Sequence, residues 1–298
     1  MPAAIGRESS PSGVRFAAHS LVNGIRRALV VVLLFSGAAT GLQSWQQAPA
    51  PAVTPSPEEM EQFLLTARIT RKTASKTGIT NTIRATLTDG RITHDAQIQT
   101  VDIAKAIVSA GPASETNFKD TYRYNIGAYQ LARLLRMTNV PMSVKRYVDG
   151  NDASVTWWVD DVQFDEKGRL QHQPVLGPDP ERTTKQVYNR LVFDELIQNK
   201  DRNLGNMVWT TDWTLWLIDH TRAFRLDKKL MQPERLVRCE RALLEAMRAL
   251  TFEDMDRAMG DVMTKDEMNA VLSRRDAIVK HFADRIARFG EPSVLFTM

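Results

Sequence analysis

Alternating apolar and polar residues mark the first folded part of the chain and predict two β-hairpins. In the first hairpin the alternation turns back at Asp89-Gly90, a dipeptide that favours a type I′ turn because both central positions of that turn need positive φ. In the second hairpin the turn is the polar segment 149–152. The expected strands are 83–87 with 92–98, and 144–148 with 154–159.

Apolar residues at helical spacing account for most of the remaining pattern. A short helix is expected over about 57–67, with a proline at its start and two glutamates in its first turn. The last helix, 265–289, has capping-box residues at Thr264 and Glu267 and a terminal glycine, Gly290. The other expected elements are helices over about 120–136, 182–198 and 233–250, a hairpin over 207–218, and a loop over 162–181.

These patterns divide the chain into two parts of different character. Residues 58–161 predict a small strand-rich lobe containing one main helix, and residues 162–298 predict a mainly helical lobe. The sequence therefore predicts an α+β fold with two lobes. Its hydrophobic content of 43% is too high for a disordered protein.

The N-terminal residues predict an export signal followed by a linker. Arg26-Arg27 precede an apolar run over 28–42 that ends in small residues, which is the three-part pattern of a secretory signal. The run is short for a membrane-spanning helix, which needs about 20 residues, but an uncleaved anchor over 28–42 stays open as the alternative. Residues 1–45 are thus an expected signal or inner-membrane anchor, and 46–57 an expected Pro/Ala linker. The protein is expected to be exported, periplasmic or secreted, and to contact a membrane only through its N-terminal segment.

Charge and cysteine content exclude two classes of protein. The net charge is +4, but the first 40 residues hold four arginines and one glutamate, which leaves 35 basic and 34 acidic residues for the rest. A near-neutral body lacks the basic footprint of a nucleic-acid-binding protein, so no nucleic-acid partner is expected. The single cysteine, Cys239, rules out an intrachain disulfide and is expected to be a small buried hydrophobe within a helix.

The residues best suited to chemistry follow the predicted helix 182–198. Phosphoryl transfer needs a carboxylate at the acceptor hydroxyl and oxygen ligands for Mg²⁺. A kinase catalytic loop supplies an Asp and, five residues later, an Asn, and a second Asp follows at the end of a hairpin. Asp201, Asn206 and Asp219 have this arrangement. Since the first two alone recur about once by chance in a chain of this length, the alternative is an Asx-rich turn between a helix and a hairpin.

The sequence FDELIQNKDRNLGN (193–206), followed by WLIDHTRAF (216–224), resembles divergent kinases that include Fam20-type secretory kinases, HipA-like kinases and phosphoinositide kinases. It resembles most a group of exported bacterial proteins with a DRNxGN…IDxTRAF signature. The segments 118–135 and Val140-Pro141 are similar to the αC helix of that group and the residues after it. The resemblance covers about residues 58–290.

This resemblance implies a two-lobed kinase-like fold and specific roles for the three polar residues. Asp201 would be the catalytic base, and Asn206 and Asp219 would be the metal ligands. The implied cofactors are a nucleoside triphosphate, with ATP as the first candidate, and Mg²⁺ or Mn²⁺. The acceptor would be an unidentified protein or small molecule.

The sequence departs from the kinase pattern at two positions that act together. The strand lysine that binds the nucleotide phosphates would align near Gln99, and its αC glutamate partner with Asn125. Their joint loss is coherent because a buried charge without its partner costs several kcal/mol, and a Gln–Asn amide pair would keep the link as a neutral hydrogen bond. Candidates for a substitute positive charge are Lys72, Lys76, Arg84 and Lys145.

Two functions therefore remain open from the sequence. The first is a nucleotide- and metal-dependent phosphotransferase of the atypical kinase type. The second is an exported pseudokinase that binds or scaffolds other molecules without turnover. Asp201, Asn206 and Asp219 favour the first, whereas Gln99 and Asn125 favour the second.

Overall fold

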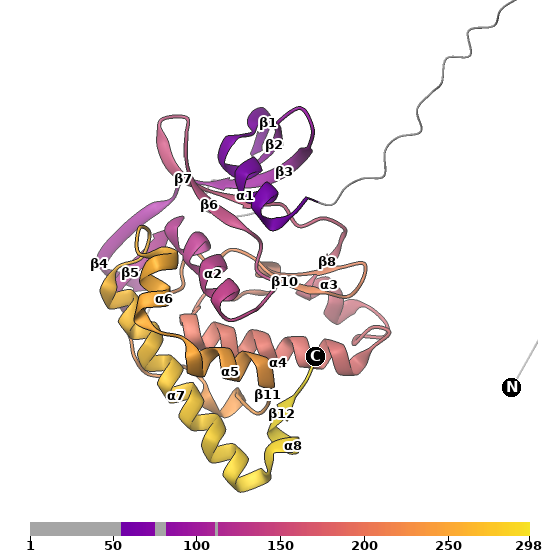
Figure 1. Ribbon diagram of the computed structural model, residues 1–298, viewed down its shortest axis with the longest axis vertical. Coiled ribbons are helices and arrows are strands. Elements are labelled where there is room, and N and C mark those ends of the chain that lie inside the picture. Colours follow the sequence, from indigo (N-terminus) through magenta and orange to yellow (C-terminus); the bar gives the residue numbers. More distant parts are fainter. Residues whose placement is uncertain (1–54, 75–81, 111–112) are drawn as a thin grey trace, which may run out of the picture. The chain divides into compact units, whose positions relative to one another are not determined.

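The computed structural model describes residues 55–74, 82–110 and 113–298, and Val53–Met298 form one compact unit (Figure 1). The expected signal or anchor over 1–45 and most of the expected linker lie outside the described residues. Helix α1 (Pro57–Thr66) begins at the last residue of that linker and is capped by Ser56. Within the described ranges, no helix is long and apolar enough to cross a membrane.

An antiparallel five-stranded sheet forms the first half of the described chain, in the order β1-β2-β3-β7-β6. Its strands are β1 (Arg68–Ala74), β2 (Ile83–Thr88), β3 (Thr93–Gln99), β6 (Ser143–Val148) and β7 (Asn151–Trp157). Alternate residues of β2 and β3, such as Leu87 and Ile98, are buried, which confirms the first predicted hairpin. Helices α1 and α2 (Arg123–Leu134) pack against β6 and β7.

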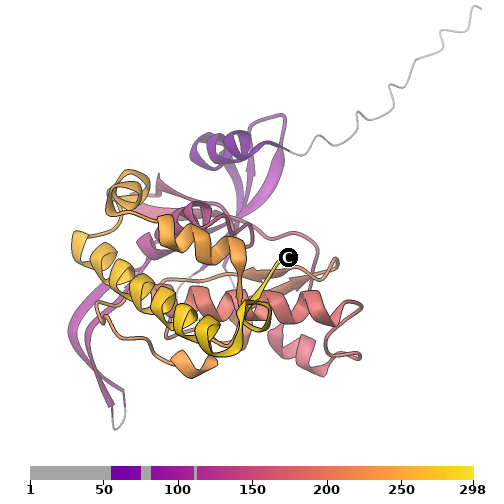
Figure 2. The same ribbon diagram turned by 60° about the horizontal axis from the view of Figure 1, so that its bottom comes forward.

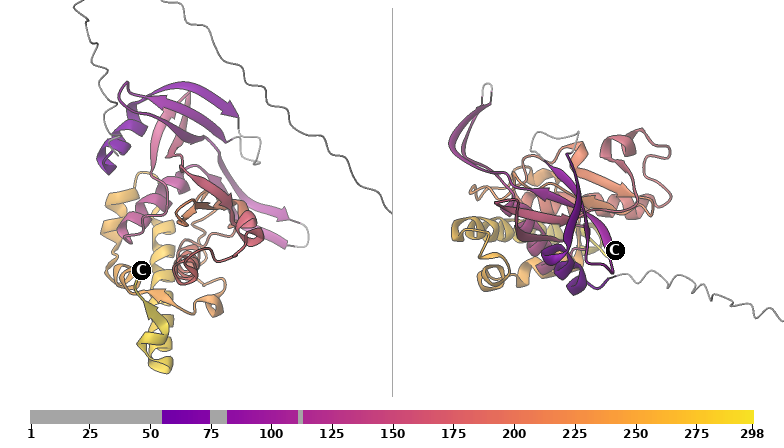
Figure 3. Two further views of the ribbon diagram at one scale, coloured as in Figure 1. Left: turned by 90° about the vertical axis from the view of Figure 1, so that its right-hand side faces the viewer. Right: turned by 90° about the horizontal axis from the view of Figure 1, so that it is seen from above.

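A two-stranded ribbon projects from this half and was not predicted from the sequence. Its strands are β4 (Asp102–Ala110) and β5 (Ala113–Thr121), which pair only with each other (Figures 2 and 3). Residues 102–107 are exposed on both faces, so they carry no alternation of apolar and polar positions. The expected helix start at Asp120 was wrong, because Asp120 still belongs to β5, which ends at Thr121, and α2 begins at Arg123.

The second half is mainly helical and contains a three-stranded sheet in the order β10-β9-β8. Helix α7 (Lys265–Phe289) has the predicted bounds, and its capping box joins Thr264 and Glu267. The other elements are β8 (Val162–Asp165), α3 (Glu166–Gln171), α4 (Pro180–Ile197), β9 (Met207–Thr210), β10 (Leu215–Leu217), β11 (Cys239–Glu240), α5 (Arg241–Ala249), α6 (Phe252–Met259), α8 (Glu291–Val294) and β12 (Leu295–Phe296).

Two predictions in this half were wrong. The segment 162–181 is not a loop throughout, since it contains β8 and α3. The helix expected from residue 233 begins at Arg241, because Cys239 and Glu240 instead form the short strand β11, parallel to β12. Cys239 is nevertheless fully buried, as expected, and burial raises the pKa of its thiol.

The type I′ turn occurs at the second hairpin rather than the first. Asp149 and Gly150 both have positive φ, 51° and 84°, between β6 and β7. At the first hairpin only Gly90 has positive φ, and the Asp89 carboxylate accepts backbone hydrogen bonds from Arg91 (2.8 Å) and Ile92 (2.6 Å). That carboxylate closes a longer loop over 89–92, so the predicted turn type was wrong there.

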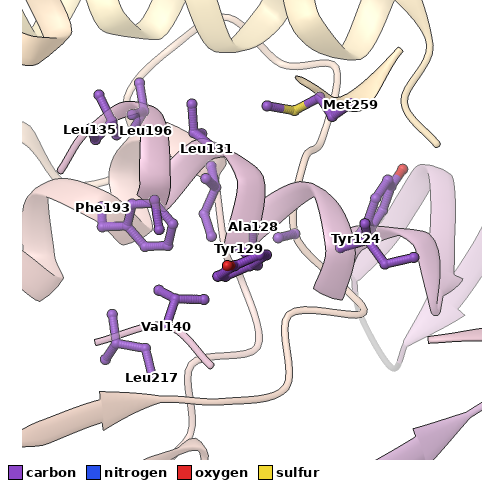
Figure 4. Packing of buried hydrophobic residues seen from close by; sticks show 14 of the residues in the cluster. Tyr124, Ala128, Tyr129, Leu131, Leu135, Val140, Phe193, Leu196, Leu217 and Met259 are labelled. Carbon is purple, nitrogen blue, oxygen red and sulfur yellow. The ribbon is translucent and has the colours of Figure 1, made fainter. Parts of the chain in front are cut away.

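One hydrophobic core joins the sheet, α2 and the helical half. Figure 4 shows residues of α2, α4, β10 and α6 gathered in this core. Leu131 of α2, Leu196 of α4 and Met259 of α6 are all fully buried. Helix α2 therefore packs on both the five-stranded sheet and the second half, and this packing fixes the position of Asn125 in its first turn.

Candidate active site

A cavity of about 840 Å³ lies between the five-stranded sheet and the helical half. The sheet contributes Arg84 of β2 and Gln97 of β3, and Thr82 lies just before β2. The segment 157–162 that connects the two halves forms another wall. The helical half contributes Asp201, Asn203, Gly205, Asn206, Ile218, Asp219, Thr221 and Arg222. All three residues predicted to carry chemistry, Asp201, Asn206 and Asp219, therefore line one cavity.

The loop after α4 is shaped by its own asparagines. Helix α4 ends at Ile197, and its C-cap residue Gln198 has positive φ (49°). The Asn199 side chain then accepts a hydrogen bond from the Asp201 backbone N–H (3.1 Å). The Asn203 side chain accepts from the Gly205 N–H (2.9 Å). The Asn206 amide nitrogen donates to the Asp201 carbonyl oxygen (3.1 Å). Since this bond occupies the nitrogen of Asn206, the amide oxygen is the atom suited to a cation.

Arg202 fixes this loop to its surroundings, and sequence reasoning did not identify it. Its guanidinium is 5% exposed and donates to the Asp194 carboxylate of α4 (3.0 Å). It also donates to the backbone carbonyls of Asn206 (2.7 Å) and Ile218 (2.8 Å). One buried cation thus holds both segments that carry the predicted metal ligands. The available signal was an arginine directly after the candidate base.

Asp219 follows β10 in an unusual backbone conformation. Its φ is 52°, and the Thr221 hydroxyl donates to its carboxylate (3.1 Å). The backbone N–H of the preceding Ile218 donates to the Asn206 carbonyl (3.1 Å). A non-glycine residue with this φ is uncommon, and such conformations persist where the surrounding structure fixes them. The loop therefore presents the Asp219 carboxylate to the cavity at a fixed position beside Asn206.

Asp201 is a half-buried carboxylate near a second carboxylate and a cation. Its side chain is 42% exposed and lies 3.5 Å from the Arg222 guanidinium. Burial raises the pKa of Asp201, while Arg222 opposes this rise and the negative charges of Asp219 and Asp120 add to it. A carboxyl group with a raised pKa is a stronger proton acceptor than an ordinary one.

Solved structures of Fam20 and of the Golgi casein kinase match about four fifths of this chain. For Fam20 of hydra, solved with sugar, the TM-score is 0.61 at 14% identity, covering 80% of this chain and 92% of that chain. For the Golgi casein kinase, the structure with Mn and ADP bound gives a TM-score of 0.58 at 13% identity, and another structure gives 0.56 at 12%. These two cover 80% and 81% of this chain and 78% of the other. No protein-family model and no curated protein matches the sequence.

The chain has a divergent kinase-like fold. This confirms the α+β, two-part architecture expected from the sequence, with a strand-rich part and a helical part. Identities this low show the fold alone, so the roles of individual residues rest on the geometry of this chain.

Gln99 and Asn125, the positions at which the resemblance implied a lost lysine–glutamate pair, contact each other. The Asn125 amide nitrogen donates to the Gln99 side-chain oxygen and, at 3.3 Å, to the Ser154 hydroxyl. The Asn125 oxygen accepts from the His220 backbone N–H (2.9 Å). Neither Gln99 nor Asn125 is among the described residues that line the cavity. The neutral pair is therefore a buried link from the sheet to the residue directly after Asp219.

The proposed substitutes for the missing lysine differ in their positions. Lys72 pairs with Asp149, and Lys145 pairs with Asp152 at 3.0 Å. Arg84 pairs with Asp95 at 2.7 Å and lines the cavity. Lys76 lies outside the described residues.

The side chains present fit a divalent metal held together with a nucleotide. Across the described part of the chain, no group of three His, Cys, Asp or Glu side chains is arranged to hold a metal by itself. Mg²⁺ in phosphotransfer sites is usually held by one or two carboxylates, water and substrate phosphates. The Asp219 carboxylate and the Asn206 amide oxygen supply hard oxygen ligands of this kind, so they would hold the ion once phosphates complete its coordination.

Proposed function

We propose that this protein is a nucleotide- and metal-dependent phosphotransferase of the atypical kinase type. The observation that carries this proposal is the convergence of Asp201, Asn206 and Asp219 on one cavity between the two parts of a kinase-like fold. An Asx-rich turn without function would not require that a distant aspartate, 13 residues beyond Asn206, face the same cavity. The Golgi casein kinase, a structural neighbour, was solved with Mn and ADP bound.

Each residue has a distinct part in this proposal. Asp219 and Asn206 would hold Mg²⁺ or Mn²⁺, and the ion would supply positive charge to offset the negative charge of the nucleotide phosphates. The Asp201 carboxylate takes up the proton of the acceptor hydroxyl and orients the hydroxyl oxygen toward the phosphate. Arg202 keeps the loop that carries Asp201 and Asn206 in register with the strand end before Asp219.

Binding of ATP by the purified protein, with and without Mn²⁺ or Mg²⁺, tests this proposal most directly. Metal-dependent binding that Asp219→Ala abolishes is the expected result, and titration calorimetry measures it. Absence of nucleotide binding under every metal condition would leave only a scaffolding role.

The second candidate is a pseudokinase that binds nucleotide or a partner without turnover. The specific observation that favours it is the neutral Gln99–Asn125 pair, which supplies no positive charge to a phosphate. Phosphate transfer to a generic protein acceptor, measured with labelled ATP, separates the two functions. Transfer that Asp201→Ala removes supports the enzyme, whereas binding without transfer to any acceptor or to water supports the pseudokinase.

A further inference from the structure

Two cationic side chains lie at separate places in the cavity between the sheet and the helical half. Among the described lining residues, only Arg84 and Arg222 are cationic. Arg84 lies over the Trp158 ring, with 4.3 Å between the guanidinium carbon and the ring centroid, at the segment that connects the two parts. Arg222 lies 3.5 Å from the Asp201 carboxylate, beside the predicted metal ligands. Only Arg222 is therefore at the end where phosphates would meet the metal.

A buried carboxylate holds Arg222 in place. The Arg222 Nε donates to Asp120 at 2.8 Å, and the Asp120 side chain is 3% exposed, whereas Arg222 keeps 30% of its surface exposed. Directly beside this pair, the Thr121 N–H donates to the Thr221 carbonyl at 2.9 Å. Two adjacent bonds thus tie the end of β5 to the loop after Asp219. The loop and the guanidinium are fixed together.

This arrangement has the physical parts of the missing lysine–glutamate pair. In a kinase, a glutamate of the αC helix forms an ion pair with the strand lysine and so orients this lysine toward the nucleotide phosphates. Here Asp120 orients a cation that comes from the opposite side of the cavity. An arginine has five N–H donors in a planar fork, so bonding to Asp120 through Nε leaves the donors of the terminal nitrogens, one of which lies 3.5 Å from the Asp201 carboxylate, to meet a phosphate.

We propose that Arg222, held by Asp120, binds the terminal phosphates of the nucleotide and replaces the absent strand lysine. The inference rests on the proposed function, because it requires a nucleotide in this cavity. It explains how the neutral Gln99–Asn125 pair is compatible with phosphate binding: the positive charge has moved to the other wall. It also assigns a role to Asp120, for which the sequence alone predicted none.

The test compares ATP and AMP as ligands in the presence of Mn²⁺. Arg222→Gln is expected to weaken ATP binding about 10- to 100-fold, the loss that corresponds to one hydrogen bond between charged groups. Its affinity for AMP is expected to stay near that of the unchanged protein, because AMP lacks the terminal phosphates. The matched control is Arg84→Gln, which removes the cation at the Trp158 wall and is expected to leave the ratio of ATP to AMP affinity unchanged.

Two further variants keep the test decisive if Arg222→Gln fails to fold. Arg222→Lys keeps the charge without the fork and is expected to recover part of the ATP affinity. Asp120→Asn leaves Arg222 without its anchoring carboxylate and is expected to lower the ATP-to-AMP ratio in the same direction as Arg222→Gln.

The outcomes separate this inference from the function on which it rests. Nucleotide binding by the unchanged protein, with the same ATP-to-AMP ratio in all Arg222 and Asp120 variants, overturns the role of Arg222 alone. No nucleotide binding by the unchanged protein overturns both. A selective loss of ATP affinity in Arg222→Gln, absent in Arg84→Gln, supports the proposal.

Discussion

At the scale of single residues, the cavity has a surplus of negative charge. Among the described lining residues are five aspartates, Asp160, Asp161, Asp165, Asp201 and Asp219, and two arginines. Arg84 pairs with Asp95 and Arg222 with Asp120, both outside the lining, and Arg222 also lies 3.5 Å from Asp201. A polyphosphate brought into such a cavity meets repulsion unless divalent cations accompany it. Binding of nucleotide is therefore expected to depend strictly on metal.

Removing the Asp219 carboxylate and removing the Asp201 carboxylate should therefore have different effects on binding and on transfer. Asp219→Ala should abolish metal-dependent ATP binding, because the cation loses its carboxylate ligand. Asp201→Ala should leave that binding nearly intact and reduce transfer by about 100-fold or more, the usual contribution of a general base. Calorimetry and a transfer assay on the same preparations measure both.

An exposed aspartate on α7 provides the control for this comparison. Asp284 is 65% exposed, pairs with Lys280 and does not line the cavity. Asp284→Ala should change neither binding nor transfer. Loss of ATP binding in Asp201→Ala to the same extent as in Asp219→Ala would contradict the separate roles.

The raised pKa of Asp201 also predicts an effect on stability. Burial disfavours the ionised form of Asp201 in the folded state, so this carboxylate destabilises the folded protein at pH values above its raised pKa. The destabilisation is lost as the pH falls through that pKa and the group becomes protonated. Asp201→Asn should therefore raise the melting temperature at pH 7, and the gain should shrink toward pH 4. The corresponding increase in the free energy of unfolding should not exceed about 1 kcal/mol, since solvent screens a half-exposed group. A lower melting temperature at pH 7 would show that the contact with Arg222 outweighs burial.

At the scale of elements, α2 connects the sheet to the loop that carries Asp219. Asn125, in its first turn, bonds to side chains from β3 and β7 and to the backbone after Asp219. The packing of α2 in the common core keeps this asparagine in place. A shift of α2 would therefore move the Asp219 loop relative to the sheet.

Removing either amide should weaken this connection measurably. Gln99→Ala or Asn125→Ala leaves a buried polar partner unpaired, which should lower the free energy of unfolding by about 1–3 kcal/mol. Asn125→Ala should also weaken metal-dependent ATP binding, because the His220 N–H loses its acceptor, whereas Gln99→Ala should affect stability more than binding. Chemical denaturation of each variant measures the first effect. Unchanged stability in both would mean that the pair contributes nothing.

The elements that the sequence predicted well are those whose signals are local. Helix α7 was predicted with its bounds because its capping box and terminal glycine lie at its own ends. Strand β11 was missed because its partner, β12, lies more than 50 residues away, and Cys239 also fits a helical spacing. The ribbon β4–β5 was missed because it is exposed on both faces and shows no apolar period.

The sequence identified the candidate site residues, but not the residues that hold them in place. The spacing of Asp201, Asn206 and Asp219 follows a pattern that one sequence can show. Arg202 and Arg222 act through partners on other elements, Asp194 and Asp120, and no local spacing indicates those contacts. Interactions that depend on tertiary proximity leave no periodic signal in the chain.

At the scale of the whole molecule, the fold is kept at sequence identities of 12–14% to its structural neighbours. A common core around α2 explains how this is possible, since a core tolerates many apolar exchanges when its volume and pattern are kept. The site residues lie in loops at the edge of that core, where the chemistry can change without loss of the fold.

The N-terminal residues predict the location of the folded unit in the cell. Arg26-Arg27 and the apolar run 28–42 precede the described residues and predict a cleaved export signal. N-terminal sequencing of protein from an exporting host should give a start near Thr40, and the processed protein should lie outside the cytoplasm. A charged residue in the apolar run, as in Leu33→Arg, should prevent export, because a charge in such a segment costs about 2.5–3.5 kcal/mol for membrane insertion. Full-length protein in the membrane fraction would indicate the uncleaved anchor, and full-length protein in the cytosol would contradict export altogether.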